Sequence, residues 1–179
     1  RRNILRRSSV GALFTGRSVA AAGVGSNELF GVDGRFAFFQ NLSITTYWAG
    51  TRTDTLKGGT SSHRAQVLYN GDRYGVIFDR LYVGKEFNPE TGFVYRSDIN
   101  KSFGLVRFSP RPRRIRAIRK FTYQASLDYV DNATSGRLET ADTQVQFAID
   151  LQNSDNFKVI YDDWYGRLGT PFAIANGVT

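Results

Sequence analysis

The segment FTYQASLDY (residues 121–129) alternates strictly between apolar and polar side chains. Its odd positions are aromatic or aliphatic, and its even positions are polar. This period of two is typical of a β-strand that has one apolar and one polar face. Similar alternation recurs at residues 32–38, 42–49 and 144–151, and no long segment has the spacing of an amphipathic helix. The sequence therefore predicts an all-β protein.

The connections between these segments indicate how the strands follow one another. We expect about nine long strands, near residues 4–16, 27–38, 42–53, 62–70, 73–85, 94–109, 118–130, 138–152 and 156–167. Tight turns, such as Asn-Gly-Asp at residues 70–72, alternate with longer loops along the chain. An antiparallel up-and-down meander then has its tight turns at one end and its long loops at the other. Outer-membrane β-barrels have this asymmetry, with periplasmic turns and extracellular loops.

Aromatic residues recur eight positions apart, as in Phe121 and Tyr129 or Tyr74 and Tyr82. An even spacing places both rings on one face of a strand, and eight tilted residues span roughly 20 Å along a barrel axis. That distance is close to the ~25 Å apolar band between the two aromatic girdles of a membrane barrel. The spacing favours such a barrel over a soluble sandwich, a lipocalin-like barrel or a jelly roll, in which the apolar face points inward.

Composition narrows the classes of function. The chain has 179 residues, with no Cys, no Met and one His, which excludes disulfides, a Cys nucleophile and a multi-His zinc site. It has no run of about 18 apolar residues, the length that a transmembrane helix needs. We expect one β-barrel domain over residues 1–179. Because bacterial barrels have an even number of strands, we expect this domain to be partial, with strands missing at one or both ends.

The net charge of +8 comes from two stretches that contain no acidic residue. They are residues 1–7 and 107–120, and both are predicted to lie at the periplasmic turn end of the sheet. There they would face anionic phospholipid headgroups or simply water. Residues 111–120 contain no aromatic side chain for base stacking, so we expect no nucleic-acid partner. The predicted periplasmic basic rim comprises Arg111, Arg113, Arg114, Arg116, Arg119 and Lys120.

Two further sets of polar residues are candidates for function. The first set lies on the polar faces of the strands, which would line the lumen of a barrel with ion pairs and amides. Its charged members are Asp33, Arg35, Asp79, Arg107, Asp128 and Asp150. The second set lies in an outer loop whose two acids are candidates to bind a cation or a sugar hydroxyl, unless the loop only closes a hairpin at the rim. The loop residues are Glu86, Asn88, Pro89, Glu90 and Gly92.

Several segments together resemble a domain-of-unknown-function family of bacterial outer-membrane β-barrels. The most specific are EFNPETGF (residues 86–93) and RFSPRP (residues 107–112), and VGALFTGRS (10–18), YNGDRYGV (69–76) and GRLET (136–140) accompany them. In that family the barrel commonly follows an N-terminal family 9-type carbohydrate-binding module, and members are often labelled carbohydrate-binding or membrane-associated hydrolases. The resemblance covers nearly all of this chain, does not include that module, and implies no catalytic residue.

The residues and the resemblance together predict the membrane-embedded barrel portion of a carbohydrate-handling protein, acting as an anchor or a conduit. We expect it in the outer membrane of a Gram-negative-type bacterium, with outer-membrane lipid as its partner and carbohydrate bound only through a module outside this chain. We expect no cofactor, no metal and no catalytic site within it. Two alternatives stay open: a membrane-associated glycan hydrolase that uses lumen carboxylates ~5–10 Å apart, and a soluble basic β-domain that binds polyanions.

Overall fold

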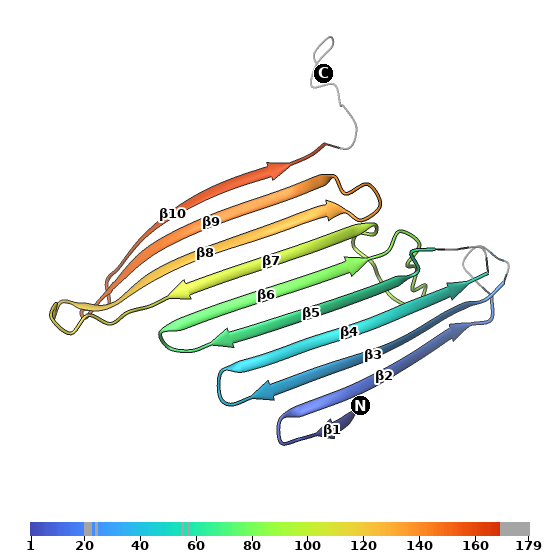
Figure 1. Cartoon of the computed structure of the whole chain (residues 1–179), viewed down its shortest axis with the longest axis horizontal. Coiled ribbons are helices and arrows are strands. Elements are labelled where there is room, and N and C mark those ends of the chain that lie inside the picture. Colours follow the sequence, from blue (N-terminus) through green and yellow to red (C-terminus); the bar gives the residue numbers. More distant parts are fainter. Residues whose placement is uncertain (20–22, 24, 55, 57, 169–179) are drawn as a thin grey trace, which may run out of the picture.

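The computed structural model describes residues 1–19, 23, 25–54, 56 and 58–168. The regular structure of this part of the chain is one open sheet of ten strands, which lie in sequence order and are each antiparallel to their neighbours (Figure 1). The predicted all-β, up-and-down meander is therefore confirmed. The strands are β1 (Arg2–Ile4), β2 (Ser8–Arg17), β3 (Asn27–Phe38), β4 (Leu42–Thr53), β5 (Ser61–Asn70), β6 (Tyr74–Val83), β7 (Ile99–Phe108), β8 (Ile118–Asn132), β9 (Leu138–Leu151) and β10 (Asn156–Gly166).

The segment predicted as a first strand, residues 4–16, contains a turn, so the short strand β1, of three residues, precedes the nine long strands that were expected. Residues 5–7 form the turn that separates β1 from β2, and its first residue, Leu5, has a φ of 58°, in the left-handed region. Leu5, Arg6 and Arg7 are not residues that usually mark a turn. Only the pairing of β1 with β2 shows that the chain reverses here.

Successive connections lie at opposite ends of the sheet (Figure 1). Short and long connections alternate as expected from β1 to β7, but the β7–β8 connection (residues 109–117) is longer than the β8–β9 connection (residues 133–137). At the left of Figure 1, which we call the turn end, are the β1–β2, β3–β4, β5–β6, β7–β8 and β9–β10 turns. The other four connections lie at the right, which we call the loop end. The β6–β7 loop covers residues 84–98, more than predicted, because β7 begins at Ile99 and not near residue 94.

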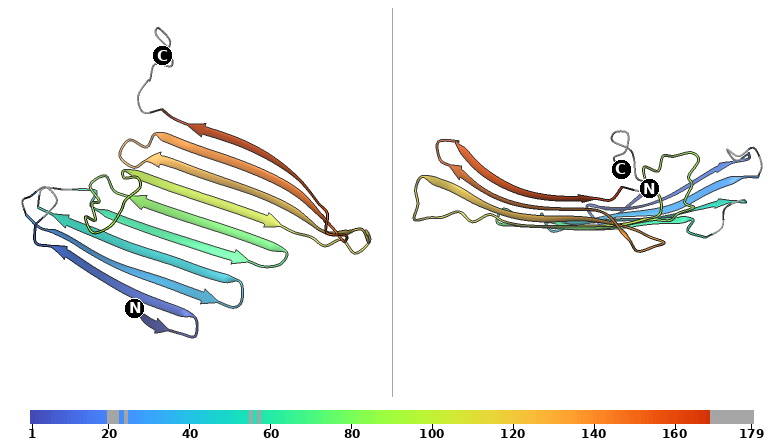
Figure 2. Two further views of the ribbon diagram at one scale, coloured as in Figure 1. Left: turned by 180° about the vertical axis from the view of Figure 1, so that it is seen from behind. Right: turned by 90° about the horizontal axis from the view of Figure 1, so that it is seen from above.

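The sheet is curved, and its two faces differ in chemistry. Seen edge-on, the strands at both edges rise to one side of the central strands, and the β6–β7 loop rises to the same, concave side (Figure 2). In the register of the strands Asp128 lies opposite Phe103, which lies opposite Asp79, so these residues share one face. This is the concave face, because Asp128 lines a pocket together with residues of the β6–β7 loop. The odd positions of β8 from Phe121 to Tyr129 therefore lie on the convex face.

The convex face carries aromatic rows near both ends of the strands. At the turn end four rings stack across β6, β7, β8 and β9, with neighbouring centroids 5.1–6.3 Å apart. These rings belong to Tyr74, Phe108, Tyr123 and Phe147. At the loop end Phe30 lies 5.6 Å from Trp48, and His63 lies 4.9 Å from Tyr82. Of the aromatic pairs eight positions apart, Tyr74 and Tyr82 contribute one ring to each row, whereas Tyr123 and Phe147 belong to no such pair.

Few side chains are fully buried, because a single open sheet encloses no core. The one buried apolar cluster of the described residues comprises Val83, Ile99 and Val130, on the concave face at the loop end. Phe87 and Val94 of the β6–β7 loop pack against it. No helix in the described part of the chain is long and apolar enough to cross a membrane.

Candidate functional site on the concave face

The charged residues predicted to line a lumen all lie on the concave face of the sheet. Most of them form ion pairs with basic residues of neighbouring strands or turns. Asp33 on β3 lies 3.0 Å from the guanidinium of Arg1. Asp128 on β8 lies 2.5 Å from the ammonium of Lys101 on β7. Arg35 lies on the same face, with its side chain exposed.

Asp79 is the most enclosed of these acids, with 9% of its surface exposed. The guanidinium of Arg64 on β5 donates to both carboxylate oxygens of Asp79, with Nε 2.8 Å from Oδ1. The amide of Gln66 donates to Oδ2 at 3.0 Å. A buried carboxylate needs such donors, because an unpaired charge away from water is costly. This network fixes β5 against β6.

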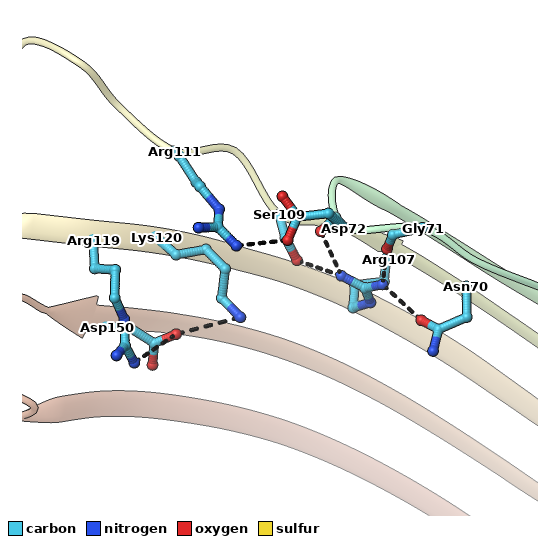
Figure 3. Close-up of polar contacts among 9 residues, drawn as sticks. All are labelled: Asn70, Gly71, Asp72, Arg107, Ser109, Arg111, Arg119, Lys120 and Asp150. Atoms are coloured by element: carbon cyan, nitrogen blue, oxygen red, sulfur yellow. Dashed lines mark hydrogen bonds and ion pairs between the residues drawn. The ribbon is translucent and has the colours of Figure 1, made fainter. Parts of the chain in front are cut away.

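Arg107 forms several hydrogen bonds at the turn end of the concave face. Its guanidinium donates to the carbonyl of Gly71 at 2.7 Å and to Oδ1 of Asn70 at 3.0 Å (Figure 3). It also donates to the hydroxyl of Ser109 at 2.8 Å. Arg107 therefore holds the β5–β6 turn against β7, which is a structural role.

The residues of the predicted basic rim, which lie in the β7–β8 turn and at the start of β8, fall into a group that forms ion pairs and a group that does not. Arg111 lies 2.6 Å from Asp72 in the neighbouring turn, and Lys120 and Arg119 lie 3.4 Å and 3.9 Å from Asp150 on β9 (Figure 3). The other three arginines form no hydrogen bond or ion pair with any described residue, and all are exposed. They are Arg113, Arg114 and Arg116.

The β6–β7 loop folds over the concave face and does not simply close the hairpin at the rim (Figure 2). Its first half is tied to strands on one side of the sheet. Glu90, whose side chain is 6% exposed, pairs with Arg17 of β2 at 3.2 Å. The backbone carbonyl of Asn88 accepts a hydrogen bond from the side-chain amide of Asn27 at 2.9 Å. The backbone N–H of Asn88 donates to the Thr51 hydroxyl at 3.2 Å.

The second half of the loop is tied to the other side of the sheet. Arg96 forms an ion pair with Glu139 of β9. The carboxylate of Asp98 accepts from the Asn132 amide at 3.0 Å and from the Thr134 hydroxyl at 2.6 Å. The loop thus spans the concave face from β2 to β9 with contacts on both sides. The carboxylates of Glu90 and Asp98 form internal ties, which the sequence did not indicate. For Glu86 the described contact is that of its backbone N–H, which donates to the carbonyl of Gly59 at 3.1 Å.

A pocket of about 520 Å³ lies between this loop and the concave wall. Aromatic side chains line it from both sides: Phe93 and Tyr95 from the loop, which are 87% and 92% exposed, and Trp164 from β10. Asp128 and Asp142 also line it, and each has a buried Oδ1 without a hydrogen-bond partner among the described residues. Exposed rings beside free acceptors suit a ligand that has both apolar surface and hydrogen-bond donors.

The described residues contain no group of three or more His, Cys, Asp and Glu side chains that could hold a metal ion. Comparison of the chain with known protein families, with curated proteins and with solved structures finds no match. The resemblance to a family of outer-membrane barrels therefore stays a prediction.

Sequence reasoning missed several residues of this face. Arg64 shares the polar face of its strand with Gln66, and Trp164 shares the face of Asp162 on β10, so alternation alone would have placed both. Asn27 is different, because its contact with Asn88 joins residues that no local pattern relates.

Proposed function

We propose that this sheet forms part of the wall of an outer-membrane β-barrel, as the anchor or conduit of a carbohydrate-handling protein. The observation that carries the proposal is the convex face, on which apolar side chains stay exposed. Tyr123 and Leu127 are 46% and 47% exposed, and no second sheet of the described residues covers them. A large exposed apolar surface is unfavourable in water and marks a membrane or partner contact, and a bilayer accommodates it.

The rows between the aromatic girdles support the same proposal. One row across β7, β8 and β9 consists of Val106, Ala125 and Val145, which are small or β-branched and uncharged. Arg80 and Asp163 are charged side chains on the convex face, and both lie nearer the loop end. The long Arg80 side chain is able to extend toward a headgroup layer. The ion-paired concave face has the polar character of a barrel lumen, and the carbohydrate role rests on the family resemblance.

A pair of adjacent residues on β8 tests which face meets lipid. We expect Ala125→Arg to destabilise the membrane-inserted protein by about 2–4 kcal/mol, the cost of Arg near the bilayer midplane. Ser126→Arg, on the concave face, is the matched control and should cost far less. The measurement is the amount of protein that resists urea extraction from membranes of a producing bacterium. Protein that leaves the membrane without detergent, or equal losses in both variants, would contradict the proposal.

A second candidate function, a membrane-associated glycan hydrolase, is favoured by one feature of the pocket. Asp128 and Asp142 lie directly opposite each other in the register of β8 and β9, which puts their Cβ atoms about 4.5–5.5 Å apart. Both side chains line the pocket, and glycosidases use two neighbouring carboxyl groups ~5–10 Å apart. Oligosaccharide hydrolysis that is lost in Asp142→Asn but kept in Asp150→Asn, at the turn end of the same strand, would support it. An inactive parent protein would reject it.

A further inference from the structure

We propose that the turn end of the sheet carries a docking rim for the headgroups of anionic phospholipid. This turn-end rim consists of exposed cations without partners and exposed apolar residues at the tips of three turns. Its members are Leu5, Arg6, Arg7, Phe39, Arg113, Arg114, Ile115 and Arg116. The inference rests on the proposed membrane location, and it adds a partner of defined chemistry at one end of the sheet.

The first observation is that some cations at the turn end have hydrogen-bond or ion-pair partners and others have none. Arg107, Arg111, Arg119 and Lys120 are engaged with carbonyls or acids of the same end. The five arginines of the turn-end rim form no hydrogen bond or ion pair with any described residue. Cations that are close together and uncompensated repel one another, and an anionic surface removes that repulsion. These five side chains therefore carry exposed positive charge that no acid of the described residues compensates.

The second observation concerns the tips of the turns. Leu5 in the β1–β2 turn is 72% exposed, Phe39 in the β3–β4 turn is 86% exposed and Ile115 in the β7–β8 turn is 47% exposed. Leu5 and Phe39 have positive φ values of 58° and 54°, a conformation that disfavours residues other than Gly and Asn. A tight hairpin turn itself requires a residue in this conformation, so the unusual feature is that exposed apolar residues, and not Gly or Asn, occupy the two tips. Exposed apolar side chains of this kind mark a membrane or partner contact.

The combination identifies the partner. A phospholipid surface presents phosphate at the level of the cations and apolar chains just below it, so it satisfies both residue types at once. The three tips belong to turns that are spread along one end of the sheet, as contact with a plane requires (Figure 1). A soluble polyanion would leave the apolar tips in water. Charge complementarity and geometry therefore favour an anionic bilayer leaflet.

The test measures lipid preference of the full chain reconstituted in bilayers of phosphatidylcholine that contain spin-labelled phosphatidylglycerol or spin-labelled phosphatidylcholine. The rim variant is Arg113→Gln, Arg114→Gln and Arg116→Gln. The control variant is Arg52→Gln, Lys85→Gln and Arg137→Gln, which removes the same charge from exposed positions at the loop end. Each rim cation removed should lower the relative affinity for phosphatidylglycerol by about fivefold, from the ~1 kcal/mol of a near-surface cation.

Loss of the preference in the rim variant and its retention in the control would support the proposal. Equal losses in both variants, or no preference in the parent chain, would overturn it. Phe39→Gly relieves the backbone conformation and removes the ring, so it should weaken contact with the lipid while leaving the fold intact. Urea extraction of the same vesicles distinguishes failure of the rim proposal from failure of the proposed membrane location. If the chain resists extraction but the rim variant keeps its lipid preference, only the rim proposal is refuted. If urea extracts the chain, the membrane location is refuted as well.

Discussion

Asp79 illustrates how a polar residue is accommodated on the concave face. The period of two in its strand places it there, but its low exposure is tolerated only because Arg64 and Gln66 donate to it from β5. A hydrogen bond to a charged group contributes more than one between neutral groups, and an orphaned buried acceptor loses its hydration without compensation. The ion pair with Arg64 therefore matters mainly because it allows the Asp79 carboxylate to be buried.

We expect Arg64→Ala to lower the free energy of unfolding by about 1–3 kcal/mol, since it leaves the Asp79 carboxylate without its main donor. Arg35→Ala is the control, because Arg35 lies on the same face with its side chain exposed. Urea unfolding in bilayers, followed by tryptophan fluorescence, measures both. Adding Asp79→Asn to Arg64→Ala should recover part of the loss. Equal effects of Arg64→Ala and Arg35→Ala would argue against the role of the pair.

At the scale of elements, the β6–β7 loop differs most from the expectation of an outer loop at the rim. Phe87 and Val94 of the loop pack on the concave cluster, and polar ties hold the loop on both sides, so residues 84–98 narrow the space beside the sheet. If the barrel is a conduit, this loop would limit the size of the solutes that pass through it. Asn27, with 2% of its surface exposed, anchors the first half through the carbonyl of Asn88.

The loop contacts can be tested with a spin label, because the chain has no native Cys. A label on Phe93→Cys, an exposed position close to the first half of the loop, should become more mobile in the Asn27→Ala background, since loss of a buried donor to Asn88 and Thr53 costs about 1–3 kcal/mol. Arg52→Ala, at an exposed position of the same end, should leave the mobility unchanged. A label that is equally mobile in the parent and the Asn27→Ala protein would show that these ties do not hold the loop.

At the scale of the whole molecule, the sheet is open, with β1 and β10 as its edges. The residues of β10 are exposed along nearly its whole length, and its outer side lacks a partner strand among the described residues. Long, exposed edge strands pair readily with other chains. The 179-residue chain alone is therefore exposed to edge-to-edge association.

We expect this chain, refolded alone in detergent, to form a mixture of oligomers and not a uniform monomer. Size-exclusion chromatography with light scattering measures the distribution. Folding of the strands themselves is checked separately by circular dichroism, so that an unfolded sample is not mistaken for association through the edges. A heat-resistant, monodisperse monomer would show that the edges close on each other and would contradict the open sheet.

The sequence by itself determined the strands, their order and the two faces of the sheet, because these depend on local features. Alternation at residues 121–129 assigns each side chain to a face, and Asn-Gly-Asp at residues 70–72 marks a turn between strands. One local turn, at Leu5, escaped this reasoning because its residues carry no turn signal.

Only the tertiary structure decided the path of the β6–β7 loop, the pocket beneath it and the division of the rim arginines into paired and unpaired groups. Each depends on contacts between residues far apart in the chain, such as Arg17 with Glu90 or Arg111 with Asp72. A local pattern assigns a residue to a strand and a face. Its partner depends on which segments the register and curvature of the sheet bring together, and that is a property of the assembled sheet.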